Sequence, residues 1–161
     1  FLEDVTNYTP NETWLYDRVK AGGGCVIDSG INAFDCLRHV LGDLKITKVG
    51  LGYRNKENTG DLEVETTAEI DFVFGKDYKG KLNVSWISDM EKRDMSFITS
   101  QGEHRIDWIS PELVGAQTDM SQEYIDIMKD FRKKLDQKNY IETAGIVALK
   151  LVMETYELAK R

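Results

Sequence analysis

Polar side chains that could line a ligand site are concentrated on a helix that we expect over Asp28–Leu41. Four of them are spaced so that they follow one face of that helix: Asp28, Asn32, Asp35 and His39. A polar face of this kind can line a cleft, where a carboxylate or an imidazole accepts the proton of a bound hydroxyl group and an amide orients it. A simpler alternative fits the same spacing: Asp28 or Ser29 caps the helix, and the other residues face water.

Other kinds of active site are not supported. Asp35 and His39 form an i, i+4 pair, but the third and fourth ligands of a zinc or iron site are missing, so we predict no metal. The run Gly22–Gly24 does not continue as GxGxxG or as a loop ending in GK[ST], so there is no nucleotide fingerprint. The sequence also lacks GxSxG and HExxH, which disfavours hydrolase functions.

Composition indicates an acidic globular protein. The chain has 161 residues, of which 41% are hydrophobic and 30% charged, enough for about one domain with its own core. Its 21 basic and 28 acidic residues give a net charge of -7, which disfavours nucleic acid and anionic membranes as partners.

The sequence also bears on location. No apolar run approaches the roughly 18 residues that cross a bilayer, and there is no signal-peptide pattern, so we expect a soluble protein. Cys25 and Cys36 form no CxxC pair and suit small buried positions in a reducing, cytoplasmic compartment. Because the chain begins at Phe1 and not at Met, we expect it to be a piece of a longer protein.

The order of the periodic segments predicts the fold class. Helices are expected at Asn11–Ala21, Asp28–Leu41, Ser121–Leu135 and Glu142–Lys160. Strands are expected at Ile46–Arg54, Val64–Phe74, Gly80–Ile87, Met95–Thr99 and Arg105–Ile109, after an arm at Phe1–Pro10. Short glycine-bearing connections favour antiparallel hairpins. We predict an α+β fold in which helices pack on one face of a predominantly antiparallel open β-sheet.

The last two predicted helices each carry an apolar stripe that needs a surface to cover. The first stripe comprises Tyr124, Ile127, Met128, Phe131 and Leu135, and the second comprises Ile146, Leu149, Val152, Met153 and Tyr156. The free face of the sheet also needs a partner, and strand residues such as Val84, Trp86 and Phe97 suit a homo-oligomer formed through that face.

The stretch Trp14–Gly42, WLYDRVKAGGGCVIDSGINAFDCLRHVLG, resembles the start of the C-terminal domain of the Gfo/Idh/MocA oxidoreductases. In that family a glycine triplet precedes D.G.H..D and a helix that ends near LG. The later segments LEVETTAEIDFVFG, GKLNVSW and SQGEHRIDW resemble the strands of the family, so the likeness covers nearly the whole chain.

The resemblance implies that residues 1–161 form a single substrate-binding and oligomerisation domain with a dihydrodipicolinate reductase-like C-terminal fold. It also implies an N-terminal Rossmann domain outside this chain, which binds NAD or NADP and supplies a catalytic Lys from an EKP motif. This chain alone would then be inactive, and its substrate would be a sugar or polyol.

Individual residues follow from the resemblance. Asp28 matches the catalytic Asp of the family, Asp35 matches the Asp that follows, and Asn32 stands where most members have His. Because an amide accepts no proton at neutral pH, Asn32 would orient the substrate while Asp28 and the Lys handle the proton. The DxGIN setting resembles the aldose 1-dehydrogenase branch, which oxidises the anomeric carbon of galactose or arabinose to a lactone. The rival is a non-catalytic sugar-binding or dimerisation module in which Asn32 marks a lost base.

Two tryptophans are further candidates for contact with substrate. The indole rings of Trp14 and Trp86 could stack on the C–H face of a sugar. Core packing or a subunit contact is the alternative for each.

Overall fold

The computed structural model describes residues 1–4, 13–54, 62–107, 121–137 and 144–160. They form two compact units, one of Phe1–Arg93 with Ala144–Arg161 and one of Asp94–Thr143. The first unit contains β1 (Leu2–Asp4), the 3-10 turn η1 (Thr13–Tyr16), α2 (Arg18–Ala21), the π-helical turn η2 (Val26–Gly30), α3 (Ile31–Leu41), β2 (Leu44–Gly52), β3 (Thr67–Phe74), β4 (Tyr78–Ser85), β5 (Ile87–Lys92) and α5 (Ala144–Ala159). The second contains β6 (Asp94–Thr99), β7 (Gly102–Asp107) and α4 (Ser121–Asp136).

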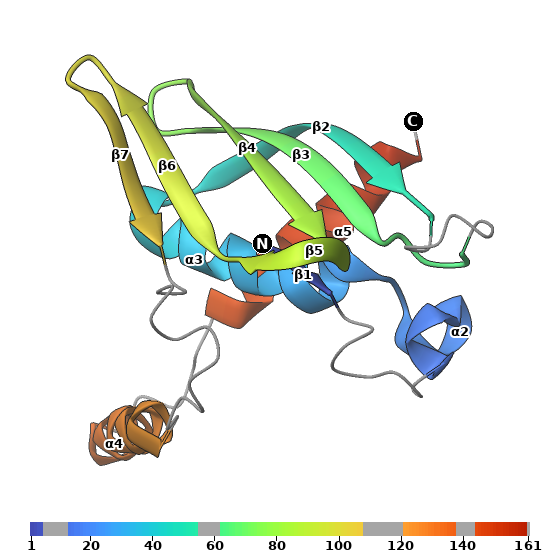
Figure 1. The fold of residues 1–161 in the computed structure, drawn as a ribbon. Coiled ribbons are helices and arrows are strands. Elements are labelled where there is room, and N and C mark those ends of the chain that lie inside the picture. Colours follow the sequence, from blue (N-terminus) through green and yellow to red (C-terminus); the bar gives the residue numbers. More distant parts are fainter. Residues whose placement is uncertain (5–12, 55–61, 108–120, 138–143, 161) are drawn as a thin grey trace. The chain divides into compact units, whose positions relative to one another are not determined.

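A five-stranded sheet with the order β2-β3-β4-β1-β5 is the framework of the first unit (Figure 1). Strands β2, β3 and β4 pair antiparallel in sequence order, as predicted. Strand β1 lies between β4 and β5, parallel to β4 and antiparallel to β5. The predicted α+β class with a mostly antiparallel sheet is thus confirmed.

The sequence does not predict two strands of this sheet. Within the arm expected at Phe1–Pro10, Leu2–Asp4 forms β1, and the Ser85 amide donates to the Phe1 carbonyl at 3.0 Å. Three residues are too few to show a period of two. The other missed strand is β5, whose sequence ISDMEK lacks the β-branched and aromatic enrichment typical of strands.

The core lies between the inner face of the sheet and helices α3 and α5, which share one side of it in Figure 1. Residues of β3 and β4 alternate between buried and exposed, as a pleated strand requires. The buried members are Ala68, Ile70, Phe72, Leu82 and Val84, and the helices add Ala33, Phe34, Leu37, Ala148, Leu151 and Val152.

The apolar stripe predicted for α5 is partly wrong. Val152 is buried, but Ile146 and Met153 are each 54% exposed, and the buried face runs instead through Ala148, Leu151 and Thr155. The helix sequence AGIVALKLVMETYELA has apolar residues on every side. Periodicity therefore does not select the face that meets the sheet.

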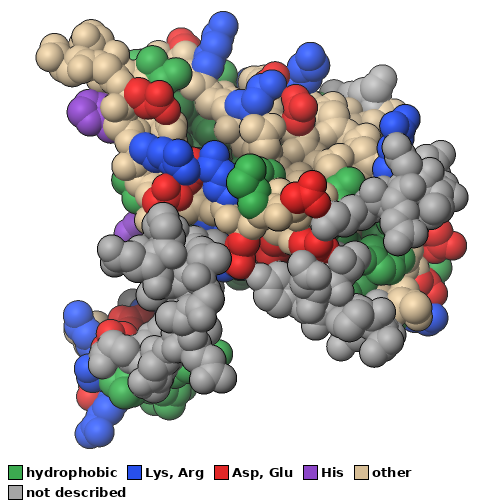
Figure 2. Space-filling model, viewed as in Figure 1, with side chains coloured by type: hydrophobic (Ala, Val, Ile, Leu, Met, Phe, Trp, Pro, Cys, Tyr) green, Lys and Arg blue, Asp and Glu red, His purple; other side chains and the backbone are tan. Residues whose placement is uncertain are grey.

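The outer face of the sheet is polar. Lys81 Nζ lies 3.3 Å from Glu69 Oε2 and 3.8 Å from Asp71 Oδ1, and Figure 2 shows acidic and basic side chains interspersed on the face turned toward the viewer. Val84 and Trp86, which we expect on the open face, are each 1% exposed and belong to the core. That expectation is wrong for both, because the inward alternation of β4 continues through Val84 to Trp86.

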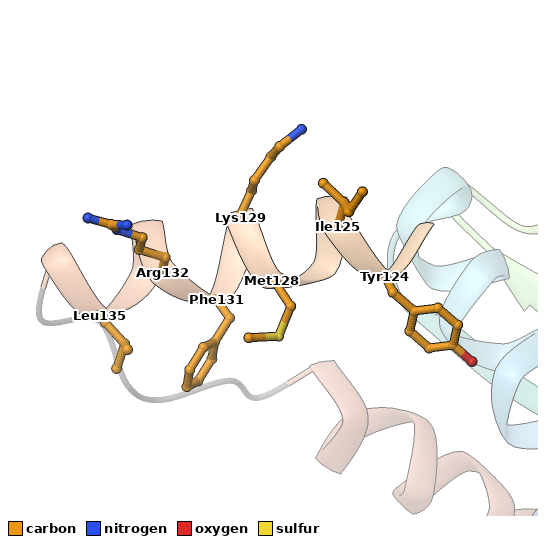
Figure 3. A pocket seen from close by; sticks show the side chains of 7 residues that line it. All are labelled: Tyr124, Ile125, Met128, Lys129, Phe131, Arg132 and Leu135. Atoms are coloured by element: carbon orange, nitrogen blue, oxygen red, sulfur yellow. The ribbon is translucent and has the colours of Figure 1, made fainter. Parts of the chain in front are cut away.

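The second unit contains a β-hairpin and one long helix. Strands β6 and β7 pair antiparallel, with Asp94 opposite Asp107 at one end and Thr99 opposite Gly102 at the other. Both lie close to the predicted strands, of which the last two residues, Trp108 and Ile109, lie outside the described residues. Helix α4 is amphipathic as predicted, and Figure 3 shows Tyr124, Met128, Phe131 and Leu135 on one side of it. These side chains are 42–64% exposed and line a shallow apolar groove with Ile125, Lys129 and Arg132.

The helix expected at Asn11–Ala21 is broken. Thr13–Tyr16 forms η1, and α2 starts anew after Asp17, whose carboxylate accepts hydrogen bonds from the Val19 and Lys20 amides. Asn11 and Glu12 lie outside the described residues. The predicted stop is confirmed, since Gly22 ends α2 with a φ of 80°.

Candidate active site

The polar face predicted on the first long helix begins in a π-helical turn. Val26–Gly30 forms η2, and regular α-helix starts only at Ile31, so the expected helix start at Asp28 is wrong by one turn. Neither η2 nor α3 has a side-chain cap at its N-terminus, so Asp28 and Ser29 do not cap the helix. Single π turns inside helices frequently occur at functional sites.

Asp28 is held through its side chain. Its Oδ2 accepts a hydrogen bond from the Trp86 indole Nε1 at 3.2 Å, and the same N–H also lies 3.1 Å from Ser29 Oγ. The Trp86 ring is 1% exposed and meets Tyr16 edge-on with 6.3 Å between centroids. Asp28 itself is exposed, so a carboxylate held by a buried partner is open to the surroundings of the protein while Trp86 lies in the core. Trp86 therefore has no open ring face for stacking on a sugar.

A chain of polar contacts continues from Ser29 to the first strand. The Ser29 hydroxyl donates to Glu3 Oε1, and Arg93 Nη2 lies 3.5 Å from Glu3 Oε2. Ser29 is 5% exposed, so this contact stabilises a polar group inside the core. The η2 turn is thus anchored to both β1 and the end of β5.

The other predicted site residues are exposed. Asn32 lies one turn after Asp28, and its Nδ2 donates to the Asp28 carbonyl at 3.3 Å. Asp35 and His39 continue the same exposed face of α3. Trp14 is 46% exposed on η1, two residues before the Tyr16 ring that packs on Trp86. Asp28 and Asn32 therefore lie together, and the turn that carries Trp14 lies beside Trp86.

Sequence reasoning missed Glu65, the most enclosed carboxylate near this turn. Glu65 is 2% exposed, and its Oε1 accepts hydrogen bonds from the Gly24 amide at 3.0 Å, the Val26 amide at 3.1 Å and the Tyr156 hydroxyl at 2.6 Å. The Cys25 amide donates to the Glu65 backbone carbonyl at 2.9 Å. Glu65 therefore binds the glycine segment by both its side chain and its main chain.

The glycine triplet is explained by this close approach. A Cβ on Gly24 would overlap the Glu65 carbonyl and lie 2.8 Å from its carbon, and a Cβ on Gly23 would lie 2.9 Å from Tyr156 Cζ. The contacts at Gly24 are with backbone atoms that cannot move aside, so glycine is required there, whereas a side chain at Gly23 would push away the end of the Tyr156 side chain. Gly22, in contrast, has open space and is needed for its positive φ.

Burial sets the protonation of two groups around Glu65. Burial raises the pKa of the Tyr156 hydroxyl above its ordinary value, and its hydrogen bond to Glu65 raises it further. Burial, and then the charge of Glu65, raises the pKa of the Cys25 thiol. Both groups hold their protons, so Tyr156 acts as a hydrogen-bond donor and Cys25 is no nucleophile.

Two observations bear on whether the described residues could hold a metal or the phosphates of a dinucleotide. In the described ranges, His, Cys, Asp and Glu do not gather in any group of three or more that could hold a metal ion. The Gly24 amide already donates to a carboxylate, which would repel a phosphate brought to the triplet.

None of the described helices has both the length and the apolar composition needed to cross a membrane.

A sequence profile described as the GFO/IDH/MocA C-terminal domain matches residues 3–105, well over half of the chain. The chain belongs to this family. The match includes the η2 turn with Asp28 and the segment before β3 that carries Glu65. The comparison with curated proteins gave no match.

Two solved structures share the fold of this GFO/IDH/MocA domain. The D-galactose-1-dehydrogenase protein from Rhizobium etli aligns with a TM-score of 0.73 at 22% identity, over 98% of this chain and 49% of that protein. An oxidoreductase from Agrobacterium radiobacter, solved with NAD+, L-tartaric acid and magnesium, aligns with a TM-score of 0.61 at 17% identity, over 99% of this chain and 53% of that protein. The chain thus spans about half the length of the structures it matches.

Proposed function

We propose that this chain is the substrate domain of an NAD(P)-dependent oxidoreductase that oxidises C1 of an aldose to a lactone. The observation that carries the proposal is the exposed Asp28 carboxylate, which the buried Trp86 indole holds in place beside the exposed Asn32 amide. Family membership supports an oxidoreductase, and the structural likeness to a D-galactose-1-dehydrogenase protein favours an aldose as substrate.

The reaction consists of two transfers, that of a hydride from C1 and that of a proton from the C1 hydroxyl group. When the C1–H bond of a cyclic aldose breaks, the hydride leaves and the C1 hydroxyl must lose its proton to form the lactone C=O bond. Asp28 lies within one helical turn of Asn32, so one carboxylate oxygen accepts the hydroxyl proton while the amide orients a neighbouring hydroxyl. Trp86 fixes the other oxygen of Asp28 and limits its rotation.

The nicotinamide cofactor would supply the hydride acceptor. The glycine triplet of this chain does not fit its phosphates, because Gly24 is already bonded to Glu65 and the carboxylate repels anions. We therefore assign NAD or NADP to an N-terminal Rossmann domain of the longer protein. A base from that domain, such as the Lys implied by the family, would then share the proton with Asp28.

A second candidate function rests on Asn32. An amide in place of an imidazole removes a proton acceptor, which suits a non-catalytic sugar-binding or dimerisation module of the same fold. This module would bind a sugar through Asp28 and Asn32 without oxidising it.

The test is turnover of NAD+ and NADP+ by the full-length protein against a panel of aldoses, inositols and sugar alcohols. We expect lactone formation from an aldose and a loss of about 10²- to 10⁴-fold in kcat/KM on Asp28→Asn. Asp43→Asn, an exposed carboxylate beyond the far end of α3, is the matched control and should keep full activity. If a folded protein that binds cofactor oxidises no aldose, the lactone proposal fails, and sugar binding by calorimetry would then support the module.

A further inference from the structure

Glu65 is a buried carboxylate that the proposed reaction does not use. It is 2% exposed, so it reaches no substrate, yet three donors from two separate parts of the chain converge on its Oε1. Charged hydrogen bonds of this kind are stronger than neutral ones and fix the geometry of their partners. Two of the donors are the amides of Gly24 and Val26, in the segment that leads to Asp28.

Hydrogen bonds connect Glu65 to Asp28 along the backbone. The Gly24 amide donates to Glu65, and the Gly24 carbonyl accepts the Asp28 amide at 3.3 Å. A displacement of Gly24 therefore displaces the first turn that carries Asp28.

A second connection runs through the neighbouring residue. The Thr66 carbonyl accepts the Trp86 amide at 2.8 Å, and the Trp86 indole holds Asp28 Oδ2. The segment of Glu65 and Thr66 thus fixes both the backbone of Asp28 and the donor to its side chain.

We propose that Glu65 is the positioning residue of the Asp28 site, acting through Gly24 and Val26. This inference rests on the proposed function, in which Asp28 touches the substrate. It also explains the two glycines before the turn. The absence of a side chain at Gly23 leaves room for Tyr156 of α5, and its absence at Gly24 leaves room for the backbone of Glu65, in the segment before β3.

The kinetic test compares Glu65→Gln with Glu69→Gln in the full-length protein. Glu69 lies on β3, is exposed and pairs with Lys81, so its variant controls for removal of a carboxylate from the same part of the chain. We expect Glu65→Gln to lower kcat at least tenfold with little change in KM, because the hydroxyl still binds but is misaligned with Asp28. Glu69→Gln should stay within twofold of wild type.

A double-mutant cycle separates positioning from a general structural role. If Glu65 acts through Asp28, Glu65→Gln should cost less than twofold in an Asp28→Asn background. An undiminished tenfold loss in that background would overturn the inference. Tyr156→Phe removes one of the three donors to Glu65 and should give a smaller loss of kcat, which likewise disappears in the Asp28→Asn background. This variant replaces Glu65→Gln in the cycle if Glu65→Gln does not fold.

A readout without turnover distinguishes this inference from the proposed function. The indole N–H signal of Trp86, assigned with Trp86→Phe, reports the contact with Asp28 by NMR. Glu65→Gln should shift this signal and speed hydrogen exchange at the Gly24 and Val26 amides. Unchanged signals and exchange would refute the role of Glu65 even if the wild type is active. If they change while no aldose is oxidised, the positioning holds and the proposed reaction fails.

Discussion

Gly24→Ala tests the close approach between the glycine triplet and Glu65. The new Cβ would overlap the Glu65 carbonyl and lie 2.8 Å and 2.9 Å from the Glu65 C and N atoms. These are backbone atoms that cannot rotate away, so the two segments must separate. Separation breaks one neutral bond, from Cys25 N to Glu65 O, and two charged bonds, from Gly24 and Val26 to Glu65 Oε1.

The expected loss of stability follows from these bonds. A neutral bond contributes about 1 kcal/mol and a bond to a charged group about 1.5–3 kcal/mol, which sum to about 4–7 kcal/mol if all three are lost. Partial relaxation should leave a loss of about 3–5 kcal/mol, a large fraction of the ~5–15 kcal/mol that a typical domain has. We expect Gly24→Ala to unfold at a much lower urea concentration than wild type.

Three other glycines provide graded controls. Gly50 on β2 has open space around a Cβ, so Gly50→Ala should be close to neutral. Gly22→Ala should cost about 1 kcal/mol, because only its φ of 80° is strained. Gly23→Ala should fall between Gly22→Ala and Gly24→Ala, because it meets the end of the Tyr156 side chain. Urea unfolding followed by circular dichroism measures all four, and a Gly24→Ala loss within about 1 kcal/mol of that for Gly22→Ala would refute the reasoning.

Two further predictions concern the groups around Glu65. Cys25 is fully buried and burial raises its pKa, whereas Cys36 is half-buried, so a thiol reagent should label Cys36 in the native protein and Cys25 only on unfolding. Mass spectrometry of the labelled peptides checks this, and native labelling of Cys25 would contradict it. Because the pKa values of Cys25 and Tyr156 are raised, the folded state holds these two protons more tightly than the unfolded chain does. The contribution of each group to the free energy of unfolding is therefore complete below its ordinary pKa, 9.0 for Cys25 and 10.0 for Tyr156, and declines as the pH rises above that value. The temperature of thermal unfolding should fall with pH across the alkaline range, and it should fall less steeply in Tyr156→Phe. The same fall with pH in that variant as in the wild type would contradict the prediction.

The sequence predicts the fold well wherever a segment is long and its period is clear. Helix α3 shows this, since Phe34 and Leu37 are buried as the helical spacing predicts. Strands β3 and β4 follow the same principle with a period of two. Strand β1 does not, because its three residues take their conformation from the neighbours that they pair with.

The candidate site is less predictable than the fold. Asp28 and Asn32 can be found from their spacing and from the glycine triplet before them. Glu65 cannot, because alternation along the predicted strand places it on the polar face with Glu69 and Asp71. In the structure Val64, Glu65 and Thr66 are all buried just before β3 begins, so the alternation does not extend to them. Only the tertiary contact with the glycine triplet reveals what Glu65 binds.

The placement of β1 has a consequence for the order of folding. Leu2 pairs with both Ser85 and Lys92, so the first strand of the chain must wait for β4 and β5 to be synthesised before its hydrogen bonds can form. Pairings so distant in sequence slow folding, because a long loop must close first. Until then β4 presents an open edge, the kind of surface through which nascent strands associate with one another. Pairing of β1 with β4 therefore removes an edge that would otherwise be open to aggregation.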